Sequence, residues 1–138
     1  MTPALRRKLW LALPAFLLCL ADQVVTLYGQ PPEYWAGDYS AAQEGAPHGL
    51  WLLHQHPGWY ILAAILYLLG IVAVIAWLPR FLARITSAGL VIGHTWGTSY
   101  WMCVFFPRQG YWISVALFVL SGFLLVLAFD VSDVPEGE

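Results

Sequence analysis

The chain has 138 residues, a formal net charge of −2, and 60% hydrophobic against 10% charged residues. Such a small and acidic net charge, without a basic stripe, excludes a nucleic-acid-binding protein. So apolar a composition is hard to keep in water, and the length fits one domain. We therefore expect residues 1–138 to form a single transmembrane domain whose first partner is the lipid bilayer.

Four long apolar runs occupy residues 9–28, 59–78, 85–106 and 111–129. Each contains about 20 residues, and a helical rise of about 1.5 Å per residue lets such a run cross a hydrocarbon core of about 30 Å. The sequence thus predicts an all-α fold, an integral membrane four-helix bundle. A long outer loop, residues 29–58, separates the first two helices, and an acidic C-terminal tail covers residues 130–138.

The positions of lysine and arginine predict the orientation of this bundle. Of the six such residues, Arg108 alone falls between the third and fourth runs; the others lie at residues 6–8 and at Arg80 and Arg84. The positive-inside rule then places both termini in the cytoplasm of a multi-pass protein of the cell (inner) membrane. An alternative is a signal peptide cleaved after Ala21, which would leave three spans.

The outer loop contains signals for short helices. The prolines at residues 31–32 end the first long helix, and Asp38 or Ser40 could cap a helical turn that ends at Gly45. Residues 48–54 are rich in leucine and tryptophan, which suits a short helix in the membrane interface.

Helix three contains Gly89, Gly93 and Gly97, one on each turn. This spacing exposes three bare backbone patches on one stripe and favours close packing of another helix within the bundle. A homodimer seam and the close approach of a ligand are the alternatives.

Two ionisable residues lie inside predicted spans. Asp22 is about 20 Å into helix one by helical rise, and His94 lies near the middle of helix three. Because a charged group is costly there, both are expected to face the bundle interior or a water-filled cavity. We expect these two residues to line a polar pocket that is open to the outside. The hydroxyls one turn further along each helix, Thr26 and Thr98, and two residues of the outer loop, Glu44 and His48, are expected to line it too.

The sequence does not identify a cofactor or a set of catalytic residues. No compact metal-ligand motif is present, so no metal site is predicted, although His48 and His94 would be its candidates. No serine or cysteine nucleophile has an evident base beside it in the sequence.

The layout of four spans, an Asp-Gln pair in helix one and a long outer loop resembles bacterial lipoprotein signal peptidase. That resemblance implies two intramembrane aspartates in helices three and four. The corresponding stretches here, residues 90–97 and 114–117, contain no aspartate. The family's catalytic dyad is therefore missing, and its activity is not implied.

A second resemblance involves Asp22-x3-Thr26 together with Glu44-x-Ala46-Pro47. This combination is similar to an uncharacterised family of small four-span bacterial and archaeal membrane proteins with a D-x3-T helix and an E-x-N-P loop. Ala46 stands where that family has asparagine. The resemblance covers the first half of the chain and implies a fold but no activity.

We therefore expect a small polytopic membrane protein that acts as a binding or accessory protein through a polar pocket. An alternative is an intramembrane hydrolase or transferase that uses Asp22 with Glu44 or His94. A second alternative is a structural subunit of a larger membrane complex, with other membrane subunits or further copies of this chain as partners.

Overall fold

The computed structural model describes residues 2–133, which form six α-helices, one short 3-10 helix and no strand. The elements in chain order are α1 (Pro3–Tyr28), α2 (Pro32–Trp35), η1 (Tyr39–Ala41), α3 (Pro47–Gln55), α4 (Pro57–Trp77), α5 (Arg80–Phe105) and α6 (Gly110–Asp133). An all-helical fold was predicted, and the structure confirms it. The acidic tail is helical as far as Asp133, and its remainder lies outside the described residues.

The helix boundaries follow from local chemistry. The Thr2 hydroxyl accepts a hydrogen bond from the Leu5 amide at 3.3 Å, so α1 begins six residues before its apolar run. Likewise, α5 begins directly after Pro79 and includes both Arg80 and Arg84. Apolar runs therefore predicted the helices correctly but underestimated their length, because polar first turns are still helical.

The segment between α1 and α4, residues 29–56, is called the connecting segment below. It contains α2, η1 and α3. Asp38 caps η1 as expected, and its carboxylate accepts from the Ser40 amide at 3.1 Å, but the turn ends at Ala41 and not at Gly45. Helix α2 was not expected, because its two prolines were interpreted only as a helix stop. Pro32 in fact occupies the first turn of α2, where a missing N–H has no helical partner to lose.

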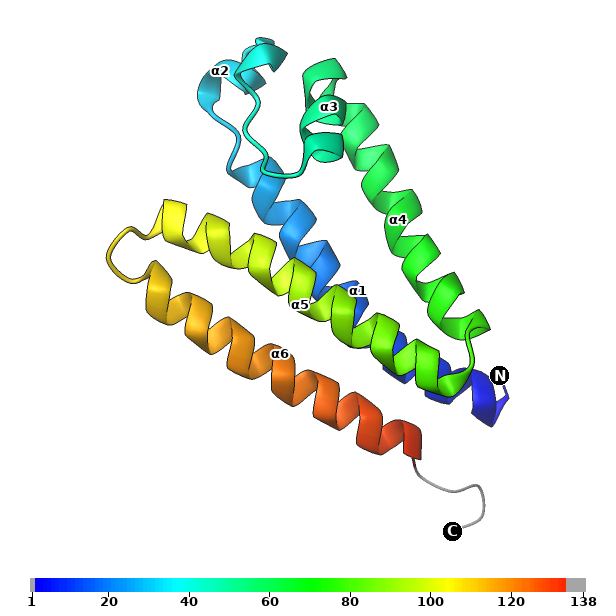
Figure 1. Cartoon of the computed structure of the whole chain (residues 1–138). Helices are drawn as coiled ribbons and strands as arrows, with labels where there is room; N and C mark the ends of the chain where they lie inside the picture. Colours follow the sequence, from blue (N-terminus) through cyan, green and yellow to red (C-terminus); the bar gives the residue numbers. More distant parts are fainter. Residues whose placement is uncertain (1, 134–138) are drawn as a thin grey trace.

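Helix α5 is central to the packing of the long helices. It packs against α1 and α6, whereas α4 packs mainly on α1 and diverges from α5 beyond their short connection (Figure 1). The buried core between these helices is made of small and aliphatic side chains, including Leu11, Ala15, Ile75 and Val91. Because α4 diverges, a wedge between α1, α4 and α5 opens toward the connecting segment.

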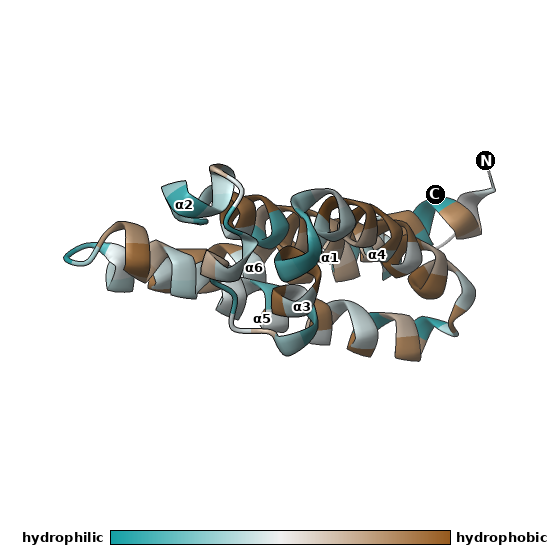
Figure 2. Ribbon diagram, turned by 90° about the horizontal axis from the view of Figure 1, so that it is seen from above, coloured by the Kyte–Doolittle hydropathy of each residue, from teal (hydrophilic) through white to brown (hydrophobic). Residues whose placement is uncertain are grey.

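Three of the long helices are long and apolar enough to cross a membrane: residues 4–28, 57–77 and 110–133. Hydrophilic residues gather in the connecting segment and in the turn between α5 and α6, whereas hydrophobic residues follow the long helices (Figure 2). Helix α5 has 26 residues, but its polar residues place it outside this group. Several of those polar residues are buried against neighbouring helices, including Ser87, Thr95 and Ser99.

Buried hydroxyls connect α5 to its neighbours. Ser87 donates to the Leu11 carbonyl of α1 at 2.6 Å, and Thr95 and Ser121 are joined by their hydroxyls at 2.8 Å across the α5–α6 contact. Such bonds are a substitute for the hydrophobic driving force that is missing between helices in lipid.

The connecting segment packs as a second, smaller core on the end of α1 and α4. Tyr34 and Leu53 are fully buried, Tyr60 of α4 is nearly so, and the Tyr34 hydroxyl donates to the Leu53 carbonyl at 3.3 Å. Gln30 ties the segment to α1, because its side-chain amide donates to the carbonyls of Thr26 and Gln43 at 2.8 and 2.7 Å. The segment is therefore a fixed cover over the wedge.

Candidate functional site

A cavity of about 960 Å³ fills the wedge between α1, α4 and α5. The connecting segment forms one wall, contributed by residues 44–46, His48, Gly49 and Leu52. Ligand pockets for drug-sized molecules usually measure about 300–1,000 Å³ and combine a mostly apolar lining with a few converging polar groups. This cavity has both properties.

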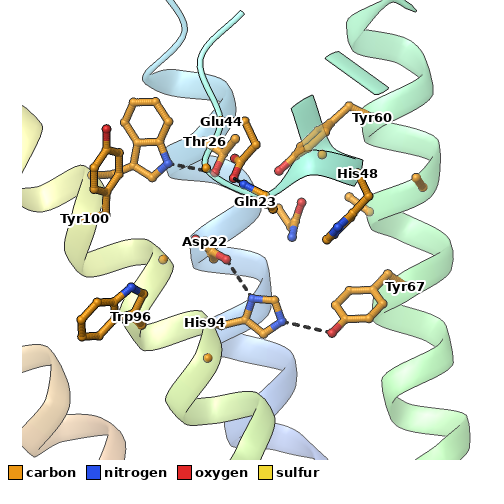
Figure 3. Close-up of a pocket in the computed structure, with 18 of the residues that line it drawn as sticks. Asp22, Gln23, Thr26, Glu44, His48, Tyr60, Tyr67, His94, Trp96 and Tyr100 are labelled. Carbon is orange, nitrogen blue, oxygen red and sulfur yellow. Dashed lines mark hydrogen bonds and ion pairs between the residues drawn. The ribbon is translucent and has the colours of Figure 1, made fainter. Parts of the chain in front are cut away.

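A chain of three polar side chains crosses the cavity from α1 to α4 (Figure 3). The Asp22 carboxylate of α1 lies 2.8 Å from Nδ1 of His94 on α5, and the other ring nitrogen, Nε2, lies 3.4 Å from the Tyr67 hydroxyl of α4. The Asp22 and His94 side chains are only 17% and 14% exposed. A carboxylate that accepts from Nδ1–H fixes the tautomer of a neutral imidazole and leaves Nε2 as an acceptor for the tyrosine.

Gly97 makes room for the Asp22 carboxylate. A Cβ atom at position 97 would lie 2.5 Å from one carboxylate oxygen and 2.8 Å from the other. Any larger residue would therefore push Asp22 away from its place beside His94. The absence of a side chain at Gly97 is a condition for the Asp22–His94 contact.

Gly89 and Gly93 differ from the expected packing stripe. A Cβ atom at either position would meet nothing within 4 Å, and both residues line the cavity. Among residues 2–133, no helix packs on that part of α5, because α4 diverges from it. The two glycines widen the cavity, and a helix seam within the bundle is the wrong interpretation for them.

Five of the six residues expected in a polar pocket do line this cavity: Asp22, Thr26, Glu44, His48 and His94. Thr98 does not. It is 4% exposed and its hydroxyl has no hydrogen-bond partner among the described residues. Trp101, one turn nearer the end of α5, lines the cavity where Thr98 was expected to do so. Its indole N–H donates to the Thr26 hydroxyl at 3.0 Å.

Glu44 and His48 reach the cavity from the connecting segment. One Glu44 carboxylate oxygen accepts from the Ala46 amide at 2.8 Å, which folds the chain just before α3. Gly49 lies against the Glu44 side chain, since a Cβ atom there would come within 3.0 Å of its Cγ. These contacts hold the carboxylate at the cavity wall.

Sequence reasoning missed the contribution of α4. Tyr60 and Tyr67 are seven residues apart, which places them on one face of a helix, and both line the cavity. That spacing was the available signal. The signal was overlooked because the rest of this helix is apolar.

Among residues 2–133, no group of three or more histidine, cysteine or acidic side chains is arranged to hold a metal ion. His48 and His94 both line the cavity, each without the further ligands that a closed site would need. The arrangement instead offers an acid–base pair, a second carboxylate and several aromatic rings around one space. Comparisons with protein-family models, curated proteins and solved structures found no match to this chain.

Proposed function

We propose that this chain is a four-helix membrane protein that binds a small amphipathic ligand in the cavity between α1, α4 and α5. Helix α5 would be the fourth span, with its polar side chains directed into the bundle. Both termini would be cytoplasmic, and the connecting segment would cover the cavity on the outer side. The proposal also includes an accessory role, in which the bound molecule belongs to a larger membrane assembly.

The observation that carries this proposal is the combination of cavity size and the buried Asp22–His94–Tyr67 chain. Placing a carboxylate and an imidazole inside a membrane helix bundle is costly and is usually found where a ligand or ion is handled. Gly89 and Gly93 leave the cavity open, although a small aliphatic residue would fit at either place. A protein that needed only a stable bundle would gain stability by filling that space.

The test is a cavity-filling substitution with a matched control. Gly93→Leu places an aliphatic side chain in the cavity, whereas Gly122→Leu adds the same side chain on α6, away from it; neither Cβ atom meets anything within 4 Å. Binding of three related probes, tetraphenylphosphonium, tetraphenylborate and triphenylphosphine oxide, is measured by equilibrium dialysis in an uncharged detergent.

If the cavity is a ligand site, at least one probe binds the unmodified and Gly122→Leu proteins and loses affinity for Gly93→Leu. Equal binding of every probe to both leucine variants would overturn the proposal. Circular dichroism and gel filtration of the two variants show that each remains folded.

The topology is tested by reporter fusions. Alkaline phosphatase, which is active only outside the cytoplasm, should be inactive when fused after residue 133 and active when fused within residues 36–38. A three-span arrangement with α5 outside the membrane would reverse the result of the fusion after residue 133.

A second candidate function is an intramembrane hydrolase or transferase. It is favoured by the contact between Asp22 and His94, because a carboxylate that orients an imidazole is the arrangement of a general base. Tyr67 is the group that faces the other ring nitrogen. A covalent adduct of a carbonyl- or phosphonate-based probe, absent from His94→Gln, would support this function; a ligand recovered chemically unchanged would oppose it.

A further inference from the structure

Among the described residues, the acidic and basic side chains that line the cavity are carboxylates and imidazoles, without a permanently charged cation. In the part of the chain that the structure describes, its lining contains two carboxylates, Asp22 and Glu44, two imidazoles, His48 and His94, and neither lysine nor arginine. With both carboxylates ionised, the lining carries a charge of −2 when both imidazoles are neutral, −1 when one is protonated, and zero when both are protonated. In none of these states does it offer a surplus positive charge to an anion.

The two carboxylates differ in how they are satisfied. The Asp22 carboxylate lies 2.8 Å from Nδ1 of His94 and occupies the space that Gly97 leaves free. Glu44 accepts only a backbone amide at 2.8 Å, and no cationic side chain of the described residues pairs with it. Glu44 is therefore the group whose negative charge remains available to a ligand.

The walls of the same cavity are rich in aromatic rings. Tyr60 and Tyr67 come from α4, and three further aromatic residues come from α5: Trp96, Tyr100 and Trp101. The face of an aromatic ring attracts a cation, by about 0.5–1 kcal/mol at exposed sites and about 2 kcal/mol or more where water is excluded. An apolar organic cation would gain from these rings both through its charge and through its hydrophobic body.

We infer that the cavity selects an apolar organic monocation, such as a quaternary ammonium, a phosphonium or a hydrophobic amine, whose charge lies near Glu44 and whose body lies along the aromatic wall. This inference rests on the proposed ligand-binding function and names its ligand class. A zwitterionic lipid headgroup fits less well, because the cavity lining has no lysine or arginine to receive its phosphate.

Tetraphenylphosphonium and tetraphenylborate are nearly identical in shape and opposite in charge, so they separate charge selection from cavity filling. Tetraphenylphosphonium is expected to bind the unmodified protein more tightly than tetraphenylborate or the uncharged triphenylphosphine oxide. Glu44→Gln keeps the acceptor for the Ala46 amide and removes the charge. It should weaken tetraphenylphosphonium binding about tenfold and leave triphenylphosphine oxide binding unchanged.

Glu33→Gln is the matched control, because Glu33 is exposed on α2 and does not line the cavity. It should leave all three affinities unchanged. The inference is overturned if tetraphenylborate or triphenylphosphine oxide is the probe whose binding is lost in Gly93→Leu while tetraphenylphosphonium binding is not. It is also overturned if Glu44→Gln and Glu33→Gln bind tetraphenylphosphonium equally. If no probe distinguishes Gly93→Leu from Gly122→Leu, the proposed binding function itself fails.

Discussion

The carboxylate of Asp22 and the imidazole of His94 meet at 2.8 Å although they are 72 residues apart in the chain. They come from two helices that pack closely, and the contact is possible because Gly97, three residues beyond His94, presents no side chain to Asp22. Helix α5 therefore supplies both the partner of the carboxylate and the space that it occupies. A small substitution at either of these two α5 positions should therefore act directly on Asp22.

Replacing Gly97 by alanine should separate Asp22 from His94. The new Cβ atom would lie 2.5 Å from a carboxylate oxygen, so the Asp22 side chain must move. A glycine-to-alanine change within a helix otherwise gains about 0.5–1 kcal/mol. We expect Gly97→Ala to destabilise the protein by about 1–3 kcal/mol, measured by denaturant unfolding in detergent, because it leaves a buried polar pair without its partners.

Gly93→Ala is the control for this prediction, since its Cβ atom would meet nothing within 4 Å in the same helix. It should be neutral or stabilising. Equal stabilities of the two alanine variants would show that Gly97 does not determine the position of Asp22.

The outline of the fold could be predicted from the sequence, because long apolar runs need helices to satisfy their backbone groups in lipid. The choice of Asp22 and His94 also followed from the sequence, since ionisable groups within apolar runs are rarely placed without a partner. The distance between them could not be predicted from the sequence, because it depends on how α1 and α5 are rotated about their axes.

The role of the glycine stripe could not be predicted for a related reason. Spacing shows that Gly89, Gly93 and Gly97 share a face of α5, but it does not show what lies opposite. Opposite Gly97 is a carboxylate, and opposite the other two is empty space, because the connecting segment and α4 keep the wedge open. One sequence pattern thus performs two local tasks: Gly97 lets α1 bring Asp22 against α5, and the other two glycines leave the cavity open.

The hydroxyls of Thr95 and Ser121 should be energetically coupled across the α5–α6 contact. Ser121 also approaches the Leu117 carbonyl of its own helix at 2.7 Å, so its single proton is donated there and Thr95 donates to Ser121. A double-mutant cycle of Thr95→Val and Ser121→Ala should give a coupling free energy of about 0.5–1.5 kcal/mol.

Ser114 provides the comparison within the same pair of helices. Its hydroxyl lies within hydrogen-bond distance of the Ser99 and Gly110 carbonyls and of Cys103 Sγ, and none of these is Thr95, so it should not couple to Thr95. Additive effects of Thr95→Val and Ser121→Ala on the unfolding free energy would contradict the proposed bond.

Tyr34 should make the connecting segment sensitive to alkaline pH. Burial, followed by the nearby Tyr39, raises the pKa of Tyr34 above its ordinary value of about 10. Above about pH 10 the unfolded chain therefore releases this proton while the folded chain retains it, so the unfolded state binds fewer protons and the free energy of unfolding falls as pH rises. The stabilisation is complete below about pH 10 and is lost as pH increases through the raised pKa.

Tyr34→Phe removes this titration together with the hydrogen bond from the hydroxyl to the Leu53 carbonyl. Near neutral pH it should cost about 1 kcal/mol. From about pH 9 to about pH 11, its unfolding free energy should decline less steeply than that of the unmodified protein. Parallel declines in denaturant titrations at these pH values would assign the alkaline loss to other tyrosines.

Gln30 should control how firmly the connecting segment covers the cavity. Its side chain is 5% exposed and makes three hydrogen bonds to the backbone: its amide donates to the Thr26 and Gln43 carbonyls, and its oxygen accepts from the Gln43 amide at 2.8 Å. Gln30→Met keeps a similar volume and removes all three. Amide hydrogen exchange within residues 31–46 should become faster by about tenfold or more, as expected for about 1–3 kcal/mol of lost local stability.

Exchange in α6 should not change in this variant, because α6 packs on α1 and α5 and not on the described helices of the connecting segment. Gln109→Met is the control, since Gln109 is exposed in the turn between α5 and α6. Because the connecting segment forms one wall of the cavity, loosening it should also weaken tetraphenylphosphonium binding while leaving the Asp22–His94 contact in place. Faster exchange with unchanged binding would mean that the cover is not needed to hold the ligand, and that the walls formed by α4 and α5 suffice.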